Sequence, residues 1–224
     1  MSTYFLVLFF SIIVPFIFSF HPKIKFHKKF SAFFLAVLLP ATLFIIWDAI
    51  FTSKGFWGFN PEHLSCIYYF GLPLEEILFF IVIPFCCIFV YHNCGLFFQK
   101  ITFPFFRQLA LIIALFSFIV GILYFGRMYT TLAFIGLSIV LILIYFDKKF
   151  PLEQFMLSYI ICQIPFFIVN GILTGSWIEN EVVWYNPNEI IGFRLRTIPF
   201  EDSFYGMLLM IMVVYIYEKI KPKT

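Results

Sequence analysis

Two short acidic motifs hold the residues of this sequence best suited to acid–base chemistry. The first, P-L-E-E, ends in Glu75 and Glu76, and the second, P-F-E-D, ends in Glu201 and Asp202. A proline followed by acidic residues is an ordinary helix start, because the helix dipole stabilises acidic side chains there. Ionisable groups beside a hydrocarbon region are energetically costly and usually face a cavity or a bundle interior. We therefore expect at least one carboxylate of each motif to be functional.

Four further polar residues are candidates for contacts with these carboxylates or with a substrate. Asp48 and Asn170 end the apolar segments that precede the two motifs, and a half-buried acid needs hydrogen-bond partners. Capping a helix C-terminus is the alternative role for both. Asn60 and Asn186 each precede a proline, a pattern that mainly indicates a turn.

The same landmarks form an internal repeat. Asn60-Pro61 recurs as Asn186-Pro187, and the motif that begins at Pro73 recurs at Pro199, both shifted by 126 positions (186−60 and 199−73). Between Asp48 and Asn170 the shift is 122, which requires a four-residue insertion in the second copy. The polar landmarks are thus retained while the apolar residues around them differ.

The composition is that of an integral membrane protein. Of 224 residues, 62% are hydrophobic and 12% are charged, against about 45–50% and about 25% in soluble domains. A spanning helix needs roughly 20 apolar residues, and a net charge of +3 is too small for nucleic-acid binding. We expect an all-α membrane protein with about seven transmembrane helices. The expected spans are 3–20, 30–51, 73–92, 107–126, 128–146, 151–174 and 198–217.

The repeat gives the expected domain organisation. Residues 1–92 and 128–224 each form a three-helix repeat, and residues 93–127 form a connector with the fourth helix. Because equivalent helices are four apart, the two repeats have parallel topology and their carboxylates lie at the same membrane face.

Lysine and arginine residues predict the orientation. Eleven fall on one side of a seven-helix arrangement and four, Lys54, Arg127, Arg194 and Arg196, fall on the other. Cytoplasmic loops carry the excess of positive residues, so we expect an outside N-terminus and a cytoplasmic C-terminus in a bacterial inner membrane.

The paired segments W-G-F-N-P with F-G-L-P-L-E-E-I-L-F-F, and W-Y-N-P with R-T-I-P-F-E-D-S-F-Y-G, resemble the flavin-free lycopene cyclase family. The resemblance covers residues 1–92 and 128–217 and implies a fused form of the two-subunit enzymes. It implies closure of the acyclic ends of lycopene, a lipophilic carotenoid, into β-ionone rings by one protonated and one ionised carboxyl group. Glu75 and Glu201 are the first candidates, Glu76 and Asp202 are partners or alternates, and other carotenoid-pathway enzymes are implied partners.

No cofactor is expected. The sequence has no G-x-G-x-x-G fingerprint for a dinucleotide or flavin and no H-E-x-x-H cluster for a metal. Two alternatives stay open: a small membrane transporter, and a carotenoid-binding protein without activity. Transport predicts a polar path through both leaflets, whereas the acidic residues here cluster on one side. Pigment analysis in a lycopene-accumulating bacterium separates these hypotheses.

Overall fold

The computed structural model describes residues 2–98 and 104–221, and within these ranges it consists mainly of seven α-helices. The helices are α1 (Thr3–Phe18), α2 (Phe30–Ser53), α3 (Leu74–Phe97), α4 (Pro104–Leu123), α5 (Met128–Phe146), α6 (Leu152–Leu173) and α7 (Phe200–Ile220). Helices α2 to α7 are long and apolar enough to cross a membrane, and α1 is shorter at 16 residues. A mostly helical membrane protein, as expected from composition, is therefore confirmed.

The break between the fourth and fifth helices is as short as the sequence indicates. Helix α4 ends at Leu123, α5 begins at Met128, and Gly126 in the turn has φ +107°. Glycine adopts this conformation without the steric clash of a side chain. The expected connector, 93–127, includes residues 99–103, which lie outside the described residues.

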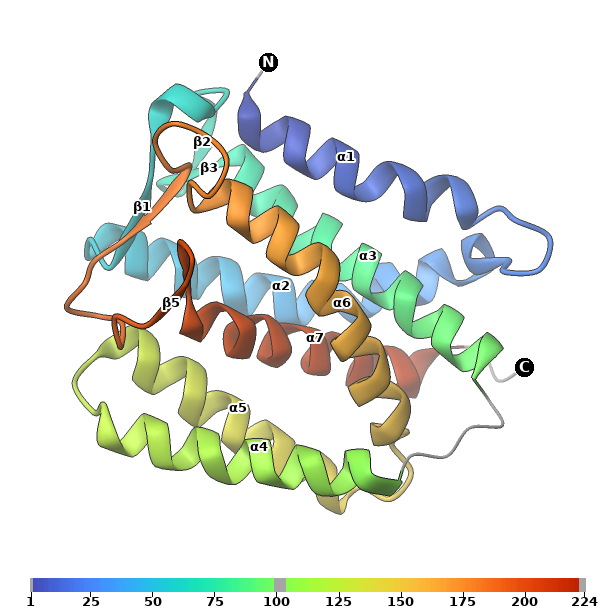
Figure 1. Ribbon diagram of the computed structural model, residues 1–224. Coiled ribbons are helices and arrows are strands. Elements are labelled where there is room, and N and C mark those ends of the chain that lie inside the picture. The colour runs from blue at the N-terminus through green and yellow to red at the C-terminus, as the bar shows by residue number, and fades with distance from the viewer. Residues whose placement is uncertain (1, 99–103, 222–224) are drawn as a thin grey trace.

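Three short antiparallel strand pairs, which the sequence did not predict, lie at one end of the helix bundle (Figure 1). The pairs are β1 (Trp57–Phe59) with β4 (Val183–Tyr185), β2 (Tyr68–Tyr69) with β3 (Leu72–Pro73), and β5 (Arg194–Leu195) with β6 (Ile198–Pro199). Strands of two or three residues are too short for a recognisable alternation of apolar and polar residues. Short 3-10 helices, η1 (Phe26–Lys29) and η2 (Pro61–His63), complete the loops.

The antiparallel pairing of β1 with β4 joins the two halves of the chain. Its central pair is Gly58 with Trp184, two residues that are 126 positions apart. A Cβ atom at Gly58 would collide with the Trp184 ring, so a larger residue here would displace that ring. The flanking backbone bonds are related by the same offset. Asn60 N–H donates to the Val182 carbonyl and Asn186 N–H donates to the Phe56 carbonyl, each at 2.8 Å, and both the two donors and the two acceptors are 126 positions apart (186−60 and 182−56).

Helices α3 and α7, which carry the acidic motifs, lie inside the bundle. Helix α3 packs against α1 and α6, α7 packs against α2 and α5, and α4 covers α5 and α6 from outside. Large apolar side chains such as Phe33, Phe80 and Phe134 fill the core between them. Prolines interrupt several helices without ending them, which neighbouring helices make tolerable in a membrane protein.

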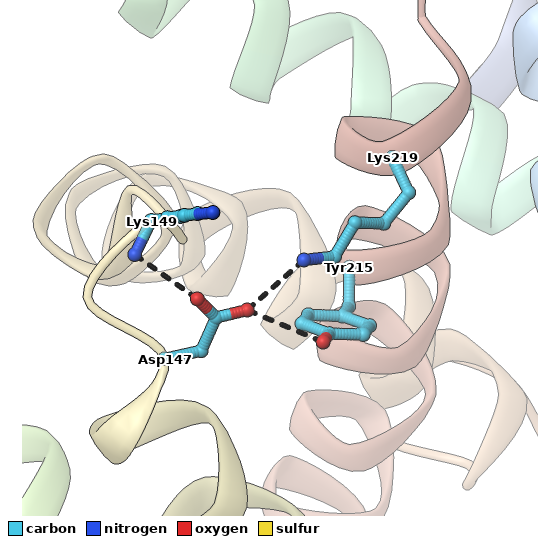
Figure 2. Close-up of polar contacts among 4 residues, drawn as sticks. All are labelled: Asp147, Lys149, Tyr215 and Lys219. Atoms are coloured by element: carbon cyan, nitrogen blue, oxygen red, sulfur yellow. Dashed lines mark hydrogen bonds and ion pairs between the residues drawn. The ribbon is translucent and has the colours of Figure 1, made fainter.

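A small ionic cluster ties α5 to α7 at the opposite end of the bundle (Figure 2). Asp147 follows α5, and its Oδ2 accepts from Lys219 Nζ at 3.0 Å and from the Tyr215 hydroxyl at 3.2 Å. Asp147 Oδ1 accepts from the Lys149 backbone N–H at 3.0 Å. The Lys219 hydrogen bond lowers the pKa of Asp147 from its ordinary value.

Candidate active site

Both acidic motifs are held at helix starts by the strand pairs that precede them. Leu74 N–H, at the start of α3, donates to the Ile67 carbonyl at 2.8 Å, and Phe200 N–H, at the start of α7, donates to the Phe193 carbonyl at 3.1 Å. Neighbouring residues of a helix point about 100° apart, at 3.6 residues per turn. The two carboxylates of each motif therefore face different surroundings.

Glu75 and Glu201 face the loops and the starts of other helices. Glu75 Oε1 accepts from the Ser2 hydroxyl before α1 at 2.8 Å, and Glu201 Oε1 accepts from the Thr130 hydroxyl in α5 at 2.6 Å. Each also accepts from the backbone N–H of the residue ten positions earlier. The donor to Glu75 is Ser65 at 2.6 Å, and the donor to Glu201 is Ile191 at 2.5 Å. Both side chains are fully buried. This arrangement joins a helix start, a loop and an acidic motif in each half of the chain.

Glu76 faces the interior, as does Asp48 near the end of α2. The Tyr4 hydroxyl donates to Glu76 Oε2 at 2.6 Å, and the Trp57 indole N–H donates to Asp48 Oδ1. Both carboxyl groups are buried and line the same cavity. Asp48 Oδ2 is buried and has no hydrogen-bond partner among the described residues.

Asp202 occupies the corresponding interior position at the start of α7 but has different neighbours. Three donors surround it: the Tyr129 hydroxyl at 2.7 Å, the Asn170 amide at 2.7 Å and the Tyr185 hydroxyl at 3.0 Å. Burial, and then the charge of Asp202, raise the pKa of Tyr185 well above its ordinary value. The Tyr185 phenol therefore stays protonated and remains a hydrogen-bond donor.

These groups line one elongated cavity of about 630 Å³, which we call the chamber. Asp48, Glu76 and Asp202 lie together in its wall, while Glu75 and Glu201 do not line it. Most of the remaining wall is apolar and comes from α1, α3, α6 and α7. Representative lining residues are Val7, Phe79, Ile83, Phe166, Val169, Leu209 and Met210. Such a chamber fits an apolar ligand with one reactive end.

The structure orders the predicted site residues differently from the sequence. Glu75 and Glu201, the first candidates, support loops, and Glu76 and Asp202 reach the chamber with Asp48 and Asn170. The reason is helix geometry, which separates adjacent side chains by more than a quarter turn.

Asn60 and Asn186 do not line the chamber. Each side-chain oxygen accepts from the backbone N–H two residues ahead, Glu62 at 3.1 Å and Asn188 at 3.0 Å. This is the local turn chemistry that Asn-Pro sequences favour.

Sequence reasoning missed the aromatic donors of the site. Trp57 is buried and donates to Asp48. Tyr4 and Tyr129 are 125 positions apart (129−4), close to the repeat offset, and both donate to chamber carboxylates. That spacing was the available signal. Among the described residues, no group of three or more His, Cys, Asp or Glu side chains could hold a metal ion.

Comparison with known proteins adds one finding. The profile of the family described as lycopene cyclase matches residues 1–94 and 126–220, so it matches the chain twice and covers most of it. Neither the curated proteins nor the solved structures contain a match to the chain. The residues between the two matched segments include α4.

Proposed function

This chain belongs to the lycopene cyclase family, and from that premise we propose that it closes acyclic carotenoid ends into β-ionone rings by acid–base chemistry. Family membership makes it a membrane enzyme of carotenoid cyclisation with a lipophilic carotenoid substrate. The observation that supports the mechanism is that the chamber wall holds two different acidic groups. The first is the pair of carboxyl groups of Asp48 and Glu76, and the second is the carboxylate of Asp202 with its three hydrogen-bond donors.

The carboxyl pair is the proposed acid. Glu76 and Asp48 are both buried in the chamber wall, where two adjacent carboxyl groups share a proton rather than both ionise. The shared proton goes to C2 of the terminal C1=C2 bond of the substrate. Glu76 is the proposed donor, and the Trp57 indole N–H holds Asp48 in place by donating to its Oδ1.

Asp202 is the proposed base. Hydrogen bonds from Tyr129, Asn170 and Tyr185 stabilise its charged form. After C2 is protonated, the C5=C6 electrons form the C1–C6 bond, and Asp202 removes the C6 proton to restore a C5=C6 double bond. One proton is gained and one is lost, so the product is an isomer of the substrate. The reaction class is therefore an intramolecular lyase or isomerase.

Aromatic rings in the chamber wall fit the cationic stage of this reaction. Tyr205 lines the chamber one turn after Asp202, and Phe79 lines it one turn after Glu76. These positions are also 126 apart (205−79). The face of an aromatic ring attracts a cation, most strongly where water is excluded. We propose that these two rings stabilise the carbocation at C1 and then at C5.

We also propose that all seven helices cross the membrane as two parallel three-helix halves. The supporting contacts are the hydrogen bonds of Glu75 and Glu201 and the central pair of strands β1 and β4, which are related by the same offset of 126 positions.

Helix α1 would be about 24 Å long at 1.5 Å per residue, so the bilayer must thin or adapt around it. The acidic end then faces outward, opposite the lysine-rich end, with the N-terminus outside. Of the eleven positive residues expected inside, Lys100 and Lys223 lie outside the described residues.

The test is expression of this chain in a lycopene-accumulating bacterium, followed by pigment analysis. Cyclisation predicts conversion of the pigment to species with β-rings, and Glu76→Gln at equal membrane abundance should prevent it. Purified protein in D2O should give product with deuterium at C2 unless the C6 proton is recycled faster than it exchanges. Lycopene that binds to the protein but stays acyclic would contradict the proposal and favour a carotenoid-binding protein.

A further inference from the structure

The chamber reaches the molecular surface between two particular helices. Among its lining residues, Phe10 of α1 and Pro165 and Ile168 of α6 are exposed, Phe10 at 67% and Ile168 at 55%. The other lining residues are buried or partly buried. Helices α1 and α6 diverge from the end that carries the strands, with α3 behind them (Figure 1). The opening thus lies on the side of the bundle, within the length of the spanning helices.

The chamber is long but its reactive groups are at one end. It follows α6 from Leu173 to Tyr159, which is about 21 Å at 1.5 Å per residue. Asn170 marks the acidic end, and Pro165 and Ile168 lie between the two ends. An extended carotenoid is about as long as the ~30 Å hydrocarbon core of a bilayer. The molecule is therefore longer than the chamber, and when one end lies at the carboxyl groups the other end must lie outside the chamber.

One position that lines the chamber carries no side chain, while the position 126 residues earlier carries a large buried one. Gly206 of α7 lines the chamber, and the residue 126 positions earlier is Phe80, which is buried against Phe44. A Cβ atom at Gly206 would meet nothing closer than 3.9 Å, the Phe166 ring. The absence of a side chain at Gly206 leaves room for ligand, whereas the matched position in the first half carries the buried Phe80 ring.

We infer that a carotenoid enters the chamber sideways from the lipid, through the opening between α1 and α6, with one end at the carboxyl groups and the other in the bilayer. The inference rests on the proposed function. Each binding event then closes one ring. A second ring requires the molecule to leave, turn end for end and enter again, so the one-ring carotenoid is a free intermediate.

The opening is tested by bulky substitutions with matched controls on the same helices. Ile168→Trp and Phe10→Trp narrow it, whereas Ile164→Trp and Phe9→Trp change exposed residues that do not line the chamber. We expect kcat/KM for lycopene in liposomes to fall at least about tenfold in the first pair, the scale of fit effects in apolar pockets, and to stay within about twofold in the second. Membrane abundance and thermal unfolding are measured for all four.

Equal activity in both pairs, or equal loss in both, would overturn the side opening. If one opening variant fails to fold, the other with its own control still decides. No cyclisation by the unaltered chain would instead overturn the proposed function.

Release of the intermediate is measured separately, by adding isotope-labelled one-ring carotenoid during turnover of unlabelled lycopene. Label in the two-ring product, or a product that stops at one ring, supports binding of one end at a time. Unlabelled two-ring product formed without mixing with the labelled pool would overturn it.

Discussion

The two halves of this protein share a scaffold but differ where they meet the chamber. Glu75 and Glu201 make the same kinds of contact in each half, a hydroxyl from a helix start and a backbone N–H ten residues earlier. The neighbouring interior acids do not. Glu76 shares the chamber wall with the carboxyl group of Asp48, whereas Asp202 accepts a hydrogen bond from the amide of Asn170.

The exchange of a carboxyl group for an amide has a direct chemical consequence. A carboxyl group can hold or accept a proton, while the Asn170 amide N–H can only donate to Asp202. In the mechanism that we propose, the first half delivers a proton and the second receives one. The two halves also differ in side-chain volume at one matched position. The first half has the buried Phe80 ring there, and the second has Gly206, which leaves open space. The two matched segments thus carry similar acidic motifs but contribute different groups to one asymmetric chamber.

The largest effect is expected from removing the acid. Glu76→Gln should lower kcat for cyclisation by ~1,000-fold, within the range of general acid–base contributions, because an amide cannot supply the shared proton. Asp48→Asn, which makes the first half resemble the second, should act similarly. Turnover is measured by product chromatography and normalised to folded protein.

Glu75→Gln is the matched control for the acid variants. Glu75 holds the Ser2 hydroxyl and a loop N–H outside the chamber, so we expect less folded protein in the membrane but nearly unchanged kcat per folded molecule. A loss of kcat as large as that of Glu76→Gln, at normal abundance, would return Glu75 to the role of acid.

The next largest effect concerns space at Gly206. Gly206→Phe should place a ring in the chamber, as Phe80 does in the other half, and reduce kcat/KM on the order of 100-fold by displacing the substrate end. Gly206→Ala is the control. Its methyl group meets no atom within 3.9 Å, and alanine stabilises a helix interior by up to about 1 kcal/mol relative to glycine. Normal activity of the Phe variant would mean that substrate does not occupy this part of the chamber.

A smaller effect is expected when the second half is made to resemble the first. Asn170→Asp replaces a donor to Asp202 by a second carboxyl group, which favours a shared proton and lowers the fraction of charged base. We expect turnover to fall about tenfold, the scale of one lost hydrogen bond to a charged group. The loss should diminish as the pH rises, because the second carboxyl group then ionises. A pH–rate profile parallel to that of the unaltered chain would contradict this assignment of the base.

Much of the fold could be predicted from the sequence because long apolar runs determine where spanning helices begin and end. The break at Gly126 and the helix starts after Pro73 and Pro199 follow from glycine and proline chemistry. The strand pairs could not be predicted, since their register depends on contacts between residues far apart, such as Gly58 and Trp184.

The composition of the site was predictable and its orientation was not. Both acidic motifs and their partners Asp48 and Asn170 follow from the repeat. Which acid of each motif faces inward depends on helix rotation, which nearly uniform apolar surroundings leave undetermined. The role of Trp57 was hidden for a related reason, because interfacial and buried tryptophans look alike in a sequence of this composition.

The smallest expected effect lies at the end of the bundle opposite the chamber, where the halves also differ. Asp147 pairs with Lys219, whereas the positions 126 earlier, His21 and Asn93, contact residues of their own segments. The Lys219 hydrogen bond lowers the pKa of Asp147, so the contribution of this carboxylate to stability is full above the ordinary value of 3.8 and is lost as the pH falls through the lowered pKa of the folded protein. In thermal unfolding of detergent-solubilised protein, the difference in Tm between the unaltered chain and Asp147→Asn should be small and constant near neutral pH, and should shrink below about pH 4. Lys219→Met should lower the Tm by the same small amount near neutral pH, and the Tm of this variant should depend less on pH than that of the unaltered chain. Tm differences that do not change between pH 3 and pH 7 would show that Asp147 contributes through packing rather than through its charge.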